Sequence, residues 1–342
     1  MIVNSGQPEN RSTDHPGNHG KMPEYLRQGL ARWGPATTPL GTPGSRDACP
    51  VAALDLTSAS RYCEELCRQH YENFTVASRL VPASLRRHFC HVYAYCRWAD
   101  DLADEMHDTQ QSLALLDWWE RQLDDCYHGT AGHPVFVALR ETIREFDIPR
   151  DPFANLLLAF RRDQRQTRYE SWEDLMEYCR GSADPVGRLV LHLGRCYDEQ
   201  LVAWSDSICS GLQIANFCQD VAGDWARGRI YLPRPLWQRV GYDERDFAGG
   251  VYDERFRAMM AEAVAEAERL LRAGWPLVRR VPRQLRFQLQ LFVRGGLAIV
   301  QAIRRQRYDV WRQRPTVSRR KKVWLAIQSR CSSLWPGQSG SP

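Results

Sequence analysis

The chain has 342 residues, with 46 Lys and Arg against 41 Asp and Glu, so its formal net charge is +5. Its hydrophobic residues (43%) and charged residues (25%) are in the proportions of a globular protein, which argues against wholesale disorder. The slight basicity does not favour nucleic-acid binding, and no uncharged apolar run reaches the ~18 residues that predict a membrane span.

The eleven cysteines form no recognisable metal or disulfide pattern. Their number is odd and no CxxC pair occurs, whereas disulfide frameworks and zinc clusters need paired spacing. The sequence also lacks a charged start followed by an apolar stretch, which a secretory signal would need. We therefore expect buried, reduced thiols in a cytoplasmic protein.

The distribution of glycine and proline divides the chain into three regions. Residues 1–50 hold seven Gly and seven Pro, and such a composition buries too little apolar surface to offset its ordering entropy, so it predicts a disordered leader. Residues 51–328 show helical periodicity without convincing period-2 alternation, which predicts a single all-α domain. Residues 329–342, ending in PGQSGSP, predict a flexible tail.

The segment 82–105 is the first that carries chemistry. Its apolar side chains recur every three or four residues, as in an amphipathic helix: Leu85, Phe89, Val92, Cys96, Ala99 and Ala103. The neighbouring stripe holds Tyr93, Arg97, Asp100 and Asp104, and Asp101 and Glu105 flank it. Two carboxylates one turn apart weaken a helix by about 0.2–0.5 kcal/mol, so a divalent cation is expected to compensate Asp100 and Asp104.

A second acidic helix is predicted within residues 208–233. Its polar stripe consists of Gln213, Asn216, Asp220 and Asp224. Asp220 and Asp224 again stand at i, i+4, and the helix gives way to a glycine flanked by Arg227 and Arg229. A single acidic pair is usually a solvated helix face, but two pairs that are each accompanied by arginine favour a shared function.

Paired carboxylates on two helices suit magnesium and a diphosphate. Mg²⁺ takes oxygen ligands, keeps several waters, and is usually held by one or two carboxylates together with substrate phosphates. Metal ions and arginines would neutralise a diphosphate as its bond to carbon breaks. The carbocation left behind would need a dry apolar pocket with aromatic faces.

Residues 304–322 are strongly basic, with nine Lys or Arg and one acid, which gives 9 − 1 = +8. Such a segment is either a solvated surface or a contact surface for anionic lipid or a polyphosphate substrate. The second interpretation would place a cytoplasmic protein peripherally on the inner membrane.

Over nearly all of residues 58–328 the chain resembles the squalene/phytoene synthase family of head-to-head prenyl transferases. The matching segments occur in the family's order: HYENFTVASRLVP (70–82), YAYCRWADDLADE (93–105), TRYESWEDLMEYCR (167–180), NFCQDVAGDWARGRIYLP (216–233) and the GGL–YDVWRQRP–KK stretch (295–322). The resemblance implies an all-α isoprenoid synthase fold with a central active-site cavity. It also implies Mg²⁺-dependent departure of diphosphate and C30 or C40 products.

The resemblance further implies roles for individual residues. The family's metal-binding carboxylates correspond to Asp100, Asp104, Asp220 and Asp224, with Asp101 as an adjacent acid. Positions that contact diphosphate, substrate or metal correspond to Arg97, Asn216 and Arg229, with Gln213, Gln219, Arg314 and His70 as further candidates. Gln219 departs from the arginine that many members carry. Tyr178 corresponds to the tyrosine beside the reacting carbons. His88 and His91 are not spaced like transition-metal ligands.

The string SADPVGRLVL, which starts at Ser182, is similar to one bacterial branch, the hydroxysqualene synthases of hopanoid biosynthesis. That branch ionises presqualene diphosphate and quenches the rearranged cation with water, without NADPH. A presqualene diphosphate synthase would then precede this enzyme, and a flavoprotein hydroxysqualene reductase would follow it. The alternatives are a squalene or presqualene diphosphate synthase that joins two farnesyl diphosphates, and a non-catalytic assembly or binding member of the same fold.

Pro185 prompts a further hypothesis about that water. Proline within a helix has no N–H and frees the carbonyl four residues before it, here that of Gly181. This carbonyl, Ser182 and Asp184 would hold a water against an apolar pocket. A packing kink without a chemical role is the alternative.

Overall fold

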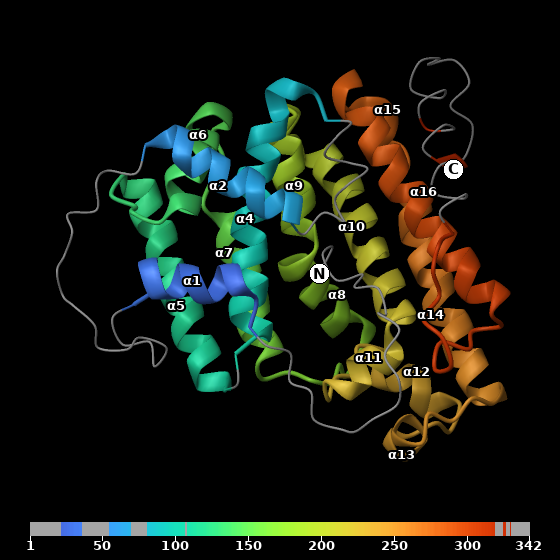
Figure 1. The fold of residues 1–342 in the computed structure, drawn as a ribbon. Coiled ribbons are helices and arrows are strands. Elements are labelled where there is room, and N and C mark those ends of the chain that lie inside the picture. The colour runs from blue at the N-terminus through green and yellow to red at the C-terminus, as the bar shows by residue number, and fades with distance from the viewer. Residues whose placement is uncertain are drawn as a thin grey trace. The chain divides into compact units, whose positions relative to one another are not determined.

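The computed structural model describes residues 22–35, 55–69, 81–106, 108–318, 324–325 and 329. Every regular element within these ranges is a helix (Figure 1), so the predicted all-α class is confirmed. Contacts group the chain into two compact units, Met1–Gln164 and Arg165–Pro342. Each unit carries one of the two acidic motifs.

The first unit is built around α4, the long helix that carries the first acidic motif. Its described helices are α1 (Glu24–Trp33), α2 (Leu56–Gln69), α4 (Ala83–Asp104), α5 (Thr109–His128), α6 (Pro134–Phe146) and α7 (Asp151–Asp163). Helix α4 packs against α2, α5, α6 and α7. Trp98 stacks on Trp119 of α5, with ring centroids 5.2 Å apart, and the Tyr95 hydroxyl donates to the carbonyl of Phe153. These buried rings fix the rotation of α4 about its axis.

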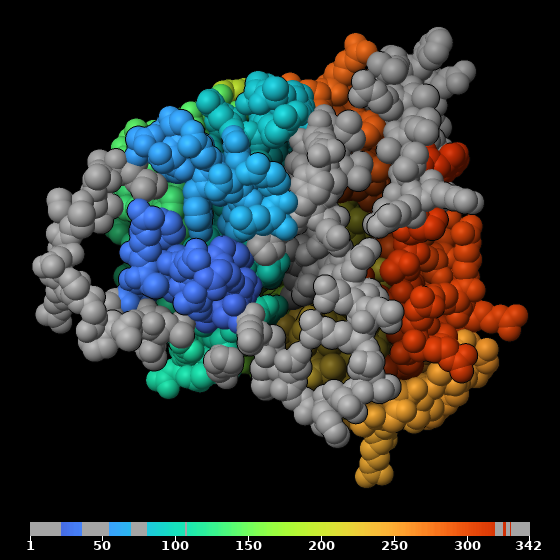
Figure 2. Space-filling view, in the orientation of Figure 1, coloured from blue at the N-terminus to red at the C-terminus, as the bar shows by residue number. Residues whose placement is uncertain are grey.

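Helix α1 corrects the prediction of a disordered leader at residues 24–33. Leu26 and Leu30 are buried, and the ring of Tyr25 lies edge-on to Trp98 with centroids 6.0 Å apart. In the space-filling view, α1 and α2 lie next to each other on one face of the first unit (Figure 2). The Gly and Pro count over fifty residues hid this short amphipathic stretch. The rest of the predicted leader lies outside the described residues.

The second unit is centred on α10, which carries the second acidic motif. Its helices are α8 (Trp172–Ser182), α9 (Asp184–Leu193), α10 (Glu199–Gln219), α11 (Val221–Ala226), α12 (Arg234–Arg239), α13 (Glu244–Ala248), α14 (Glu254–Ala273), α15 (Leu277–Arg280) and α16 (Arg283–Arg305). Helix α10 packs against α14, α9 and α16. A Cβ on Gly211 would lie 2.9 Å from the backbone nitrogen of Leu271, so glycine allows α10 and α14 to approach closely.

Polar residues start two of the helices that position the second motif. The side chain of Ser171 accepts from the backbone N–H of Asp174 at the start of α8, and that of Asp198 accepts from the N–H of Leu201 at the start of α10. Such caps satisfy backbone donors that have no partner within the helix. They fix where α8 and α10 begin.

Three further predictions meet the structure outside the motifs. None of the helices in the described part of the chain is long and apolar enough to cross a membrane. The nine cysteines in the described ranges are free thiols, and most of them are buried, as predicted. Ser329, the first residue of the predicted flexible tail, is buried and lies 3.3 Å from Arg294 Nη1, which donates to its hydroxyl.

Candidate metal and diphosphate site

The first acidic motif lies at the C-terminal end of α4. Asp100 and Asp101 are buried, and the backbone N–H of Glu105 bonds to the carbonyl of Asp101 as the helix ends. Arg97 serves both acids, because its Nε donates to Asp101 Oδ2 over 2.9 Å and its Nη1 lies 3.7 Å from Asp100 Oδ2. Arg97 therefore lies on the same side of α4 as these acids, and its contact with diphosphate or metal stays a prediction.

Several carboxylates lie close together in this motif. Burial, followed by the neighbouring carboxylates of Glu105 and Asp104, raises the pKa of Asp101 to about 9. Arg97 donates a hydrogen bond to Asp101. A divalent cation beside Asp100 and Asp104 would relieve the remaining repulsion. The donors are all carboxylate oxygens, which fits Mg²⁺.

The second acidic motif lies where α10 passes into α11. The backbone N–H of Asp220 bonds to the carbonyl of Asn216, and that of Asp224 bonds to the carbonyl of Asp220. Asn216, Asp220 and Asp224 therefore follow one another at intervals of one helical turn. Two carboxylates and an amide oxygen at this spacing are a second set of ligands that fits Mg²⁺.

Arg314 and Gln219 hold this motif to a distant part of the chain. The Arg314 guanidinium makes a bidentate contact with Asp220: its Nε donates to Oδ1 over 2.8 Å and its Nη2 donates to Oδ2 over 3.1 Å. The Gln219 amide donates to the carbonyl of Pro315. Arg314 therefore positions Asp220, and its contact with a diphosphate stays a prediction. The diphosphate role of Gln219 stays a prediction.

Arg229 lies beside a small pocket at the end of the second motif. Its backbone N–H bonds to the carbonyl of Asp224, and Arg227 Nη1 lies 3.9 Å from Asp224 Oδ1. The pocket is lined by one acid, Asp224, one base, Arg229, and mainly apolar side chains. The other lining residues are Phe217, Val221, Ile230, Tyr231, Leu232 and Phe247. An acid, a base and apolar side chains therefore lie next to one another at the end of this motif.

Tyr178 belongs to a cluster of aromatic rings. Its side chain is buried, and its ring centroid lies 5.4 Å from that of Tyr169, 5.6 Å from Tyr231 and 6.1 Å from Phe217. Phe217 and Tyr231 stack with centroids 3.9 Å apart, and both also line the pocket beside Arg229. Aromatic faces attract cations, so this cluster can stabilise positive charge next to the second motif.

The remaining candidates divide between described and undescribed positions. Gln213 is buried on α10, one turn before Asn216 and Phe217. His70 lies outside the described residues. The predicted cluster of ions shared by both acidic motifs stays a prediction.

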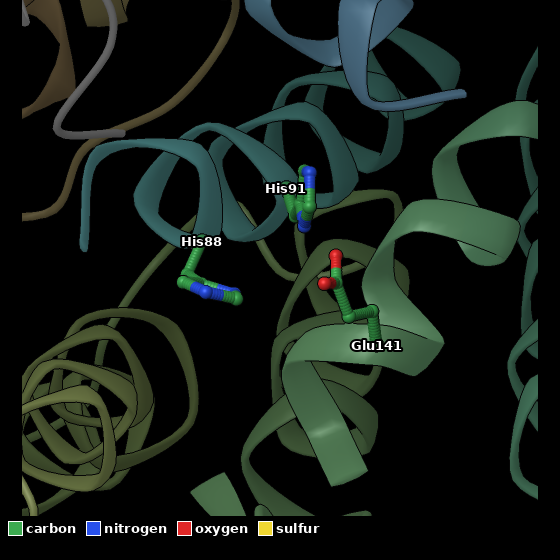
Figure 3. Close-up of side chains that lie close together, drawn as sticks. All are labelled: His88, His91 and Glu141. Carbon is green, nitrogen blue, oxygen red and sulfur yellow. The ribbon is translucent and has the colours of Figure 1, made fainter. Parts of the chain in front are cut away.

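Spacing along the sequence did not predict a third group of polar side chains. His88 and His91 of α4 and Glu141 of α6 lie close together (Figure 3), with one ligand atom of each within 4.8 Å of the others. Both Nδ1 atoms contact the hydroxyl of Thr142, at 2.9 and 2.8 Å. Arg87 lies 3.1 Å from Glu141, and its positive charge opposes a cation there. We interpret the group as a hydrogen-bonded link between α4 and α6.

The helices and the two carboxylate motifs define an all-helical enzyme of the isoprenoid synthase fold. The structure is similar to the crystal structure of squalene synthase HpnC from Alicyclobacillus acidocaldarius, with a TM-score of 0.72 and 43% identity over 75% of this chain and 97% of that one. It is also similar to a dehydrosqualene synthase in complex with ligand, with a TM-score of 0.74 and 26% identity over 81% of this chain and 96% of that one.

Sequence comparison gives the family. Residues 67–321 match Squalene/phytoene synthase, and the chain belongs to this family. A phytoene synthase from Arthrospira platensis is 28% identical over 292 residues, which span 82% of this chain and 94% of that protein. The chain is therefore a squalene/phytoene synthase family enzyme that binds isoprenoid diphosphates, in a family that typically uses Mg²⁺. The alternative of a non-catalytic member is not supported.

Proposed function

We propose that this enzyme converts presqualene diphosphate into hydroxysqualene and diphosphate. The 43% identity to squalene synthase HpnC supports the choice of branch. The observation that carries the chemistry is the second motif, where Asn216, Asp220 and Asp224 lie one turn apart and Arg314 fixes Asp220. The buried aromatic cluster around Tyr178 adjoins this motif through Phe217.

The residues divide the work between the two ends of the substrate. Bound Mg²⁺ would supply positive charge to the leaving diphosphate, and the ligands for it are Asp100, Asp104, Asn216, Asp220 and Asp224. Arg97 and Arg229 orient the same head group. Tyr178 and its aromatic neighbours keep water away from the hydrocarbon and stabilise the cation. The electron pair of the broken C–O bond leaves with diphosphate, and the oxygen of a water molecule then bonds to carbon.

Condensation of two farnesyl diphosphates is the second candidate function. The similarity to a dehydrosqualene synthase over 96% of that chain favours it. Such an enzyme would release presqualene diphosphate or, with a reductant, squalene. It would use the same two acidic motifs, so the motifs alone do not separate the two reactions.

Product analysis from each substrate distinguishes these functions. Purified protein is incubated with presqualene diphosphate and Mg²⁺ without NADPH, and in parallel with farnesyl diphosphate, and the C30 products are identified by mass spectrometry. We expect hydroxysqualene from the first substrate, no dependence on NADPH, and loss of product when EDTA removes the metal. If the protein turns over farnesyl diphosphate but not presqualene diphosphate, the proposal is overturned in favour of the second function.

The partners we propose are the enzyme that supplies presqualene diphosphate and the enzyme that reduces hydroxysqualene. We also propose that this enzyme is cytoplasmic and binds peripherally to the inner membrane. Part of the basic segment is already neutralised, because Arg304 pairs with Glu268 and Arg314 with Asp220. The basic residues 319–322 lie outside the described ranges. Cosedimentation with phosphatidylglycerol vesicles should fall as salt is raised, and equal binding to neutral phosphatidylcholine vesicles would contradict an electrostatic contact.

A further inference from the structure

The helical path is interrupted between α8 and α9 in the second unit, and we call this interruption the helix break. It corrects the hypothesis that Pro185 kinks a single helix. Helix α8 ends at Ser182, Ala183 is the junction, and Pro185 lies in the first turn of α9. Proline is well tolerated in the first turn, because the N–H it lacks would have no partner there. The break therefore separates two helices instead of bending one.

Two polar groups are buried at this break. Asp184 is 2% exposed, and its Oδ1 accepts from the Ser210 hydroxyl over 2.9 Å. The Ser182 hydroxyl is buried and has no hydrogen-bond partner within the described residues. A buried hydroxyl without a partner costs about 1–3 kcal/mol. An ordered water molecule is one of the partners that satisfy a buried hydroxyl of this kind.

Close packing of α9 on α10 holds Asp184 in place. A Cβ on Gly187 would lie 2.3 Å from the Ser205 hydroxyl and 2.6 Å from Cys209 Sγ. Only glycine lets the two helices approach this closely. Because Asp184 precedes Gly187 by one turn and Ser210 follows Ser205 by five residues, this contact brings the carboxyl and the hydroxyl together.

The break lies on the same helix pair as the aromatic cluster. Ser182 follows Tyr178 by one turn of α8, so both lie on one face of that helix. Ser210 precedes Phe217 by two turns of α10, a distance of about 10 Å along the helix axis. Tyr178 contacts Phe217, and Asp184 contacts Ser210. The polar break and the aromatic rings are therefore two sites along one contact between helices.

We propose that the Ser182 hydroxyl and the Asp184 carboxyl position the water molecule that captures the substrate's carbocation. This inference rests on the proposed function. The water oxygen gives an electron pair to the cationic carbon and a C–O bond forms. The resulting oxonium ion loses one proton, which the released diphosphate takes up, so the products are a neutral alcohol and monoprotonated diphosphate.

The charge state of Asp184 suits a positioning role. Burial, followed by the negative charge of Asp206, raises its pKa to about 8, against the opposing effects of Ser210, Arg188 and Arg180. Near pH 7 the group is therefore mainly a neutral carboxylic acid, which both donates and accepts hydrogen bonds. An ionised carboxylate next to a carbocation would compete with water and bond to it as an ester.

The test is the ratio of alcohol formed to diphosphate released from presqualene diphosphate and Mg²⁺, with ¹⁸O-labelled water to identify the source of the oxygen. Loss of one hydrogen bond to the water should lower this ratio in Ser182→Ala by about fivefold, with alkene products making up the difference. Asp184→Val should lower it further, whereas Asp184→Asn, which keeps donor and acceptor, should restore it. Ser207→Ala, at a half-buried serine of α10 whose hydroxyl bonds to the Ala203 carbonyl, is the matched control.

Ser182→Ala separates chemistry from folding. Its hydroxyl bonds to no described protein group, so the variant should melt at or above the wild-type temperature, and a change in products then reports on the water. An unchanged ratio in both Ser182→Ala and Asp184→Val would overturn the inference. If the wild-type enzyme releases no diphosphate from presqualene diphosphate, the proposed function fails instead.

Discussion

The contact between Asp220 and Arg314 leads to a prediction about the Mg²⁺ requirement of the enzyme. The two oxygens of Asp220 accept from the guanidinium fork over 2.8 and 3.1 Å. Groups that orient a metal ligand typically contribute about 10–100-fold to metal affinity or activity. We expect Arg314→Ala to raise the Mg²⁺ concentration for half-maximal diphosphate release by about tenfold or more. Arg312→Ala, at an exposed arginine two residues away, is the control and should leave the titration unchanged.

The raised pKa of Asp184 predicts a pH dependence of stability. Its ordinary value is 3.8 and its folded value about 8, so between these values the folded state binds more protons than the unfolded state. The free energy of unfolding should therefore fall as pH rises from about 4 to 8. Asp184→Asn does not titrate and should flatten this slope. Urea unfolding at pH 5 and pH 8.5 measures it, and equal slopes for both proteins would contradict the prediction.

Sequence spacing predicts some residue contacts and misses others for a physical reason. Asp100 with Asp104, and Asp220 with Asp224, are one turn apart along a helix, so local periodicity places them together. The contact between Arg314 and Asp220 joins residues 94 positions apart, and no periodicity encodes it. The same holds for Asp184 with Ser210, which only the packing of α9 on α10 brings into contact.

At the scale of helices, replacing glycine by alanine should change the free energy of unfolding in opposite directions in α1 and α16. A Cβ on Gly29 would lie 2.4 Å from the buried ring of Trp98, whereas nothing lies within 4 Å of a Cβ on Gly295 in α16. Overpacking at a rigid ring costs about 1–3 kcal/mol, and replacing a helical glycine by alanine gains about 0.5–1 kcal/mol. Gly29→Ala should lower the free energy of urea unfolding, and Gly295→Ala should raise it.

Equal effects of the two alanines would show that α1 does not pack on Trp98 in solution. Helix α1 could have been found in the sequence with a shorter window, because Leu26, Leu30 and Trp33 recur at helical spacing. The break at Ala183 was harder to predict. Proline is compatible both with a kink inside a helix and with the first turn of a new one, and the residues around Pro185 do not decide between them.

At the scale of the whole molecule, the proposal requires the two acidic motifs to serve one set of ions. Asp104→Asn and Asp224→Asn should each lower kcat by at least about a hundredfold, because each removes a ligand from the same catalytic unit. The double variant should then be barely worse than either single one, since groups that act as a unit are strongly non-additive. Asp117→Asn, at an exposed acid, is the control. Multiplicative losses would show that the motifs act independently.

The family and the all-α fold were predicted from whole segments in their order along the chain, and the comparisons confirm both. The central cavity was predicted only through the resemblance. A cavity is made by side chains from many elements, and neither composition nor helical periodicity fixes their joint arrangement. The choice of substrate also depends on the shape of this cavity, because presqualene and farnesyl diphosphates share a head group and differ only in the hydrocarbon.

The return of the chain from α16 to Asp220 limits how this enzyme can be shortened. The residues after 305 follow the long helix α16 and are rich in arginine, so they look like a dispensable extension. However, Arg314 and the carbonyl of Pro315 are hydrogen-bonded to Asp220 and Gln219 at the end of α10. A protease cut or an engineered stop codon before these two positions would remove the counterion of Asp220, which we propose to bind the metal, while leaving the helices up to α16 intact. Such a product would be expected to remain folded and lose turnover, an inactivation that circular dichroism alone would overlook.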